Sequence, residues 1–386
     1  MLQRLRFLVA GESHGPALVG ILEGLPAGVP VTREGLAQDL RRRRLVAGRS
    51  ARQQLEGDDV EVLAGLRGGH TLGSPVALVL KNAEAARWAA AMDPFHTDTA
   101  AAAAVQVTRP RPGHADLAAA KKLDADDLRE VLERASARET AMRVALGSLP
   151  RALLAAVGVS VTSTVRSLGE VCAPDLELSF AERSARADAS PVRCVDEGSA
   201  ARMLAAIDEA RATGDTLGGE LEVTTTPLPQ GLGSYAHADR RLSARLAAAV
   251  GSIPAVRGVG FGVAFEAARR SGRAMHDAIL DADGHRASNR AGGLEGGMSN
   301  GMPLVLRAAV KPLSMVAGGL ESVDLVSGAP APGFGERSDT TAVPAAAVVA
   351  EAMVCLVLAD ALLEKFGGDT LAQLRAHLGA TGHRLP

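Results

Sequence analysis

The feature that most constrains the fold is an apolar segment near the C-terminus, residues 343–366. Pro344 suits the first turn of a helix, and Gly367-Gly368 suits its end. Between them, the run Met353-Val354-Cys355-Leu356-Val357-Leu358 leaves no polar stripe. A helix that is apolar on most of its sides has to be buried, so we predict a core built around this helix.

The remaining pattern of short strands and longer helices favours the α+β class. Blocks of strands and helices alternate without regular βαβ units, which argues against a doubly wound parallel sheet. The other candidate helices span about 33–44, 126–156, 198–212, 238–250 and 370–378, and the candidate strands span 5–10, 17–23, 60–64, 75–80, 158–165, 219–225 and 303–310. The Ala-rich residues 83–105 are weakly patterned, which predicts an irregular, mobile connection.

Composition excludes several classes of protein. The net charge of −2 and the aromatic content of 2% argue against a nucleic-acid binder. The three cysteines are too widely spaced for a disulfide framework or a zinc site, so we expect a reduced, cytoplasmic protein without a metal. No apolar run is long enough to predict a membrane span, and no signal-peptide pattern is visible. One large domain and two domains are both compatible with 386 residues.

Residues Gly11-Glu12-Ser13-His14-Gly15 form a polar pentad between two apolar runs. Two strands would hold Ser13 and His14 rigidly at their junction, which suits proton chemistry. The string also matches G-x-S-x-G of serine hydrolases, but that motif requires a helix directly after the serine. Residues 16–30 are rich in Gly and Pro and predict strand, turn and strand instead. A purely structural turn remains an alternative.

An arginine cluster follows, with Arg41 to Arg44 at the end of a candidate helix and Arg49 and Arg52 in the next loop. Cations are favoured at a helix C-terminus, which is one explanation. The other is a multiply anionic small molecule, because guanidinium groups bind phosphate and carboxylate in a bidentate manner. A non-catalytic anion- or RNA-binding module would rest on the same arginines.

Two further segments carry arginines beside groups that can exchange protons. In Arg111-Pro112-Gly113-His114-Ala115-Asp116 the prolines stiffen the loop, which makes His114 an acid–base candidate as well as a plain solvated histidine. In the helical region 126–156, Arg134 and Arg138 are four residues apart and should share a face. That face is either an ordinary charge ladder or, because Ala135, Ser136 and Ala137 are small, a surface that a flat ligand can approach.

Two weaker signals complete the pattern. Residues 292–301 contain five glycines but have neither a dinucleotide fingerprint nor a P-loop lysine. Arg337-Ser338-Asp339 places an arginine and a carboxylate just before the apolar C-terminal helix, near its positive end.

Four of these segments, in this order, resemble the signatures of chorismate synthases: Gly11–Gly15, Arg111–Asp116, Ser136–Ala145 and Arg337–Asp339. The resemblance runs from about residue 5 to 366 and identifies residues 1–386 as one domain of this family. It implies a β-α-β sandwich with central helices between antiparallel sheets, assembled as a homotetramer. It also implies the 1,4-elimination of phosphate from 5-enolpyruvylshikimate 3-phosphate to give chorismate, which needs reduced FMN without net redox change.

The resemblance further assigns roles to individual residues. His14 would protonate the departing phosphate, His114 would act near the flavin N1 locus, and Asp339 would assist the flavin N5 in removing the C6 proton. The implied substrate-binding residues are Ser13, Arg43, Arg49, Arg52, Arg111, Ser136, Arg138 and Arg337. The implied FMN-binding residues are Arg134, Ala135, Ser136, Pro254, Ala255, Gly296, Lys311, Pro312, Leu313, Ser314, Met315 and Arg337.

The implied chemistry supplies the counter-charge that the arginines require. Substrate and FMN together bring roughly six negative charges to one site. Pro254 stands where the family often has asparagine, and Lys311-Pro312 lacks the hydroxyl pair that often follows, so we expect partly main-chain contacts there. Whether the enzyme reduces its flavin with NADPH or depends on a separate flavin reductase stays open. The lack of a dinucleotide fingerprint favours an outside source of reduced flavin.

Overall fold

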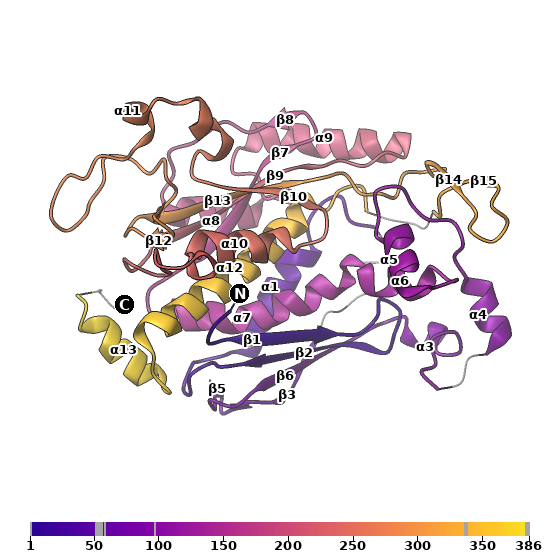
Figure 1. Ribbon diagram of the computed structural model, residues 1–386, viewed down its shortest axis with the longest axis horizontal. Helices are drawn as coiled ribbons and strands as arrows, with labels where there is room; N and C mark the ends of the chain where they lie inside the picture. The colour runs from indigo at the N-terminus through magenta and orange to yellow at the C-terminus, as the bar shows by residue number, and fades with distance from the viewer. Residues whose placement is uncertain (1, 51–56, 58, 96–97, 336–338, 383–386) are drawn as a thin grey trace.

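Three helices lie between two antiparallel sheets in the computed structural model, which describes residues 2–50, 57, 59–95, 98–335 and 339–382. The helices are α1 (Arg33–Arg44), α7 (Thr140–Ala155) and α12 (Val343–Phe366). In Figure 1 one sheet lies below these helices and the other above them. This arrangement confirms the predicted α+β class and the β-α-β sandwich.

The lower sheet has the order β1-β2-β6-β3 and the upper sheet the order β10-β13-β9-β7-β8, with antiparallel pairing throughout. Their strands are β1 (Arg6–Ala10), β2 (Ala17–Glu23), β3 (Val60–Ala64), β6 (Val76–Lys81), β7 (Val161–Leu168), β8 (Val171–Cys172), β9 (Gly219–Pro227), β10 (Val256–Phe261) and β13 (Pro303–Val310). Each of the seven strands expected from the sequence is present, within about three residues of its predicted ends.

Smaller elements connect these layers. The helices are α3 (Ala85–Trp88), α4 (Thr99–Val105), α5 (Asp116–Leu123), α6 (Arg129–Ala135), α8 (Phe180–Ala189), α9 (Glu197–Thr213), α10 (Leu242–Gly251), α11 (Gly272–Met275) and α13 (Leu371–Gly379), with 3-10 turns η1 (Ala137–Glu139), η2 (Ala238–Arg240) and η3 (Ala264–Arg269). The short hairpins are β4 (Leu66–Arg67) with β5 (His70–Thr71), β11 (Leu294–Glu295) with β12 (Met298–Ser299), and β14 (Glu321–Val323) with β15 (Pro330–Pro332).

The apolar helix α12 is the centre of the core, as the sequence predicts. It spans residues 343–366, and its side chains are buried apart from those of Glu364 and Lys365. By length and apolar composition α12 could cross a membrane, which corrects the expectation that no run is long enough. The apolar window is wholly buried inside the protein, so α12 is a core helix.

Close packing joins the layers through two glycines. α7 packs on the lower sheet and α12 on the upper sheet, and the two helices contact each other. A Cβ on Gly147 of α7 would lie 2.4 Å from the Cβ of Ala352 on α12, and a Cβ on Gly20 of β2 would lie 2.5 Å from the sulfur of Met142. Because interiors are packed near crystal density, only glycine allows these approaches.

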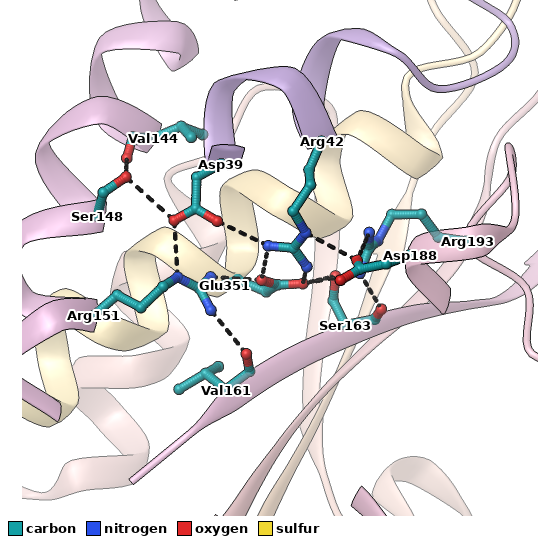
Figure 2. Close-up of polar contacts among 10 residues, drawn as sticks. All are labelled: Asp39, Arg42, Val144, Ser148, Arg151, Val161, Ser163, Asp188, Arg193 and Glu351. Carbon is teal, nitrogen blue, oxygen red and sulfur yellow. Dashed lines mark hydrogen bonds and ion pairs between the residues drawn. The ribbon is translucent and has the colours of Figure 1, made fainter. Parts of the chain in front are cut away.

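A buried ionic cluster fixes α1, α7 and α12 to each other and to β7 (Figure 2). At its centre the carboxylate of Glu351 on α12 accepts two hydrogen bonds from Arg42 at 2.8 Å, one from Arg193 at 3.1 Å and one from Ser163 at 2.6 Å. Arg151 of α7 donates to the same carboxylate at 2.5 Å. The buried carboxylate of Glu351 is therefore paired inside the apolar core.

One predicted helix is wrong in a way that matters for function. The sequence suggests continuous helix over 126–156, whereas the chain breaks at Ser136, whose backbone is extended (φ −63°, ψ 138°). The Ser136 side chain accepts a hydrogen bond from the backbone N–H of Arg138 and starts a new turn. Serine can interrupt a helix in this way because its hydroxyl accepts a hydrogen bond from a nearby backbone N–H in place of the helical carbonyl. Arg134 and Arg138 therefore do not share a face.

Smaller differences have similar local causes. The predicted helix over 238–250 begins at Leu242, after a separate 3-10 turn. The connection 83–105 contains the short helices α3 and α4, and α8 and β10 were not predicted. One apolar cluster extends from Leu5 to Leu378, and a second, smaller one contains Val107, Ala120, Leu128 and Leu132. The single domain over residues 1–386 stays a prediction.

Candidate active site

A cavity of about 390 Å³ opens where the pentad, α1, α6, the η1 turn and five loops meet. Its lining contains residues from segments that lie far apart in the sequence. They are Ser13, His14, Arg43, Arg49, Ser50, Arg111, Gly113, His114, Ala115, Leu132, Ala135, Ser136, Ala137, Arg138, Pro254, Ala255, Lys311, Leu313, Ser314, Met315 and Asp339. The structure thus brings together sixteen of the residues expected from the sequence.

The pentad is the tight connection between β1 and β2, as predicted. Gly11 has φ +109°, and a Cβ there would lie 2.3 Å from the carbonyl oxygen of Ala17, so only glycine fits. β2 begins at Ala17, and strand follows the turn where a hydrolase elbow requires helix. The hydrolase alternative is therefore excluded by the local geometry.

His14 is held by Glu133 from α6. Its Nδ1 lies 2.8 Å from Oε1 of Glu133 and its backbone N–H donates to Oε2 at 2.8 Å. Burial alone would raise the pKa of Glu133, but the hydrogen bonds from His14 and the nearby Arg129 outweigh it, and the pKa is lowered. An ionised Glu133 accepts from Nδ1–H, which leaves Nε2 as the ring nitrogen available to the cavity.

Asn82, just after β6, ties this turn to the cavity's cationic wall. Its amide nitrogen donates to the carbonyls of Glu12 and Gly15 at 3.1 and 2.8 Å, and its oxygen accepts from Nε of Arg138 at 3.0 Å. Asn82 is buried. A buried amide that satisfies three polar groups at once fixes the position of both the turn and the guanidinium.

His114 has a similar carboxylate partner. Its Nδ1 lies 2.6 Å from Oδ1 of Asp116, which also accepts from Nη2 of Arg111 at 2.9 Å, while Nε of Arg111 donates to Oδ2 at 2.7 Å. Burial alone would raise the pKa of Asp116, yet these bonds hold that pKa well below its ordinary value. Each of the two histidines therefore has Nδ1 on a buried carboxylate.

Some arginines of the cluster form ion pairs within the chain, and others line the cavity. Arg41 pairs with Glu34 on the surface, and Arg42 belongs to the buried cluster around Glu351. Arg43 lines the cavity, where its Nη2 donates to the carbonyl of Ala137 at 3.1 Å. The idea that the whole cluster needs an external anion is thus wrong for Arg41 and Arg42, because carboxylates of this chain neutralise them.

Asp339 lies at the cavity in a charged pair with Arg49. Its Oδ2 is 2.7 Å from Nη1 of Arg49, and its Oδ1 accepts from the backbone N–H of Ser50 at 2.7 Å. Both side chains are largely buried, with exposed fractions of 8% for Arg49 and 15% for Asp339. The expected base and one expected anion-binding arginine therefore already hold each other in place.

The loop after β13 forms another part of the cavity wall. Lys311 donates to Ser314 at 2.9 Å, and Ser314 donates to the carbonyl of Gly113 at 2.9 Å, which joins this loop to that of His114. Burial, with a contribution from Arg257, lowers the pKa of Lys311. Ala255 has φ +70°, uncommon for a non-glycine residue, and its carbonyl accepts from the N–H of Lys311.

Some expected site residues lie elsewhere. The Arg134 side chain donates hydrogen bonds to the backbone carbonyls of Val9 on β1 and of Gly11, the first residue of the pentad. Gly296 lies in the turn between β11 and β12, and neither it nor Pro312 is part of the cavity lining. Arg52 and Arg337 lie outside the described residues.

Sequence reasoning missed the roles of Asn82, Trp88, Glu133 and Asp116. Glu133 and Asp116 belong to segments already singled out, but nothing in their spacing from His14 and His114 marks them as partners. Asn82 and Trp88 stand in the weakly patterned stretch after β6. That Trp88 is the only tryptophan of the chain is the one signal that could have drawn attention to it.

A sequence model of the family described as chorismate synthase matches residues 5–363. The chain belongs to the chorismate synthase family. It is 54% identical over 377 residues to the chorismate synthase of Thermobifida fusca, covering 96% of each chain. It is also 54% identical to that of Acidothermus cellulolyticus, covering 97% of this chain and 98% of the relative.

The solved structures agree. A crystal structure of a chorismate synthase superposes with a TM-score of 0.79 at 38% identity and covers 99% of this chain and 98% of that one. Members of the family are phosphate lyases of the shikimate pathway that convert 5-enolpyruvylshikimate 3-phosphate to chorismate and use reduced FMN. The family and fold that the sequence signatures imply are therefore confirmed.

Proposed function

We propose that this chain catalyses the elimination of phosphate from 5-enolpyruvylshikimate 3-phosphate to give chorismate, in the cavity that His14, His114 and Asp339 share. The observation that carries this proposal is the charge of that cavity. Arg43, Arg49, Arg111, Arg138 and Lys311 line it, with Asp339 as the one carboxylate among the described lining residues. A chain of net charge −2 concentrates cations here, which suits a substrate with one phosphate and two carboxylate groups.

The same cavity fits reduced FMN. Apolar walls from Leu132, Pro254, Leu313 and Met315 suit a flat ring, and Ser136 and Lys311 supply polar contacts. Ala135 and Ala255 add backbone that a flat ring can approach closely. When bound, reduced FMN supplies transient electron density to the allylic system, and the protein provides position and electrostatics.

His14 is the proposed general acid. Glu133 holds Nδ1, so Nε2 of His14 is the ring nitrogen that would deliver a proton to the leaving phosphate. We assign His114 to the flavin side of the cavity, since Ser314 joins its loop to the Lys311 loop. Asp339 is the proposed carboxylate for removal of the C6 proton. Ser13, Ser136, Arg43, Arg49, Arg52, Arg111, Arg138 and Arg337 remain the proposed substrate contacts, and Arg134, Gly296 and Pro312 proposed FMN contacts.

The assembly and the electron supply extend this proposal. We propose a homotetramer, because the outer face of the lower sheet exposes Leu8, Val19 and Ile21, an apolar surface of the kind that subunit interfaces cover. The three cysteines are free thiols, as a cytoplasmic protein requires. An external source of reduced flavin, with or without NADPH, is the expected electron supply.

An anaerobic assay tests the activity and the flavin supply together. Chemically reduced FMN is added to the chain with 5-enolpyruvylshikimate 3-phosphate, with and without NADPH. We expect chorismate and phosphate in both mixtures, and none from oxidised FMN plus NADPH alone. Absence of chorismate with fully reduced FMN contradicts the proposed function. Product from oxidised FMN with NADPH would show that the chain reduces its own flavin.

The Asp339→Asn variant tests the proposed base. We expect turnover to fall by about 10²-fold or more, since asparagine keeps the hydrogen bond from Ser50 but accepts no proton. The substitution also removes the carboxylate that pairs with Arg49. Since the Arg49 guanidinium can then bind the anionic substrate instead, the affinity for substrate should not fall. The measurement is single-turnover chorismate formation, with Asp283→Asn on an exposed loop as the matched control. Normal single-turnover kinetics in Asp339→Asn would remove Asp339 from proton transfer.

A further inference from the structure

The indole of Trp88 stacks on the imidazole of His14. The ring centroids are 4.1 Å apart and the planes are inclined by 36°. Trp88 ends α3, in the stretch for which the sequence predicts only irregular structure, and it is half-buried. Glu133 binds His14 through Nδ1 at the ring's edge, so the two neighbours constrain different motions of the ring.

Arg129 holds both neighbours of His14. Its guanidinium carbon lies 5.1 Å from the centroid of the Trp88 indole, and its Nη1 is 3.4 Å from Oε1 of Glu133. The same guanidinium lies 5.6 Å from the ring of Phe334, and its Nε donates to the carbonyl of Val105. Cation–π contacts of a buried arginine are worth more than exposed ones, because water does not compete. Arg129 therefore fixes Trp88 relative to the carboxylate that orients His14.

We propose that Trp88 is a positioning residue for His14, which its indole and the Glu133 carboxylate together hold with Nε2 toward the cavity. This inference rests on the proposed role of His14 as the acid. Rotation of the ring about its Cβ–Cγ bond would break the Glu133 hydrogen bond, and tilting would break the stack. A displacement of about 1 Å at a proton donor can lower turnover by up to about 10²-fold.

The elements that border His14 carry charged groups from three parts of the chain. Glu133 and Arg129 lie on α6, Glu84 and Arg87 lie on or next to α3, and Arg138 and His114 line the same cavity. Of these neighbours, Trp88 contacts the face of the imidazole and Glu133 contacts its Nδ1, so the two contacts together fix the orientation of the ring.

A double-mutant cycle tests the role in catalysis. Trp88→Leu should lower kcat about 10-fold and leave the substrate KM within about 2-fold, whereas Trp88→Phe keeps a stacking ring and most of the turnover. In a His14→Ala background, Trp88→Leu should change kcat by less than about 2-fold, because the residue it positions is gone. An equal loss in both backgrounds overturns the proposal. Phe95→Leu, an exposed aromatic in the same stretch, is the matched control.

Fluorescence tests the stack without any catalytic activity. Trp88 is the only tryptophan of the chain, and its indole contacts the His14 ring, so its emission reports on this contact. On the full chain without added flavin at constant pH, we expect the emission intensity of Trp88 to change in His14→Gln and to stay unchanged in His237→Gln. Equal emission of the parent chain and His14→Gln overturns the stack. If the emission changes as expected but the chain forms no chorismate, the stack stands and the proposed function fails.

Discussion

Replacing Glu351 by alanine is expected to lower the free energy of unfolding by about 3–5 kcal/mol. The variant leaves Arg42, Arg151 and Arg193 to share Asp39 and Asp188 at the centre of the helical layer (Figure 2). Burial makes an uncompensated charge costly, and the carboxylate that accepts from all three guanidinium groups is gone. Such a loss is a large share of the stability of an ordinary domain.

Denaturant unfolding followed by far-UV circular dichroism measures this effect. Glu61→Ala is the matched control, because Glu61 pairs with Lys81 on the surface, where the two side chains are 50% and 72% exposed. We expect that control to change the free energy of unfolding by no more than about 1 kcal/mol. Equal effects of the two substitutions would show that the Glu351 cluster does not stabilise the helical layer.

The Glu351 cluster should also make stability depend on acid. Burial would raise the pKa of Glu351, but Arg42, Arg151 and Arg193 outweigh it and hold the pKa far below its ordinary value of 4.5. As the pH is lowered, Glu351 is therefore protonated first in the unfolded chain, at about pH 4.5. The contribution of Glu351 to the free energy of unfolding is lost as the pH falls further toward its pKa in the folded chain. The stability difference between the parent chain and Glu351→Gln should be constant from pH 6 to 8 on this account. It should shrink below about pH 4.5, and a difference that grows with acid would contradict this assignment.

Replacing His14 by alanine is expected to lower turnover by about 10²–10⁴-fold, the usual contribution of a general acid or base. The physical reason is that His14 is the histidine whose Nδ1 and backbone N–H both contact the Glu133 carboxylate, and alanine has no group that can donate a proton into the cavity. FMN affinity should stay within a few-fold, because the expected flavin contacts lie on other loops. Stopped-flow phosphate release and a flavin titration measure the two quantities separately.

His237→Ala is the matched control for this variant. His237 is an exposed histidine that also has a carboxylate neighbour, Asp239 at 2.7 Å, and it is not part of the cavity lining. We expect its rate to equal that of the parent chain. A His14→Ala variant with an unchanged rate would transfer the acid role to another group, with His114 as the next histidine to test.

Local patterns were sufficient for most secondary structure. The ends of α12 follow from Pro344 and Gly367, which begin and end a helix for reasons within a few residues. The sequence does not predict the break at Ser136, because the same residues can form a continuous helix. The hydrogen bond from Arg138 to Asn82, which forms only in the folded chain, favours the break. The sequence shows no signal for β10, whose Gly-containing strand depends on its pairing with β13.

The amino-acid sequence by itself determined the family, the buried helix, and the identity of most groups around the cavity. Only the tertiary structure decided which arginines serve the site, since Arg42 and Arg43 are adjacent yet one enters the Glu351 cluster and the other the cavity. It likewise decided that Glu133, Asn82 and Trp88 surround the pentad. Those contacts join residues about 70 to 120 positions apart, and no local pattern encodes a contact that forms only when separate elements pack together.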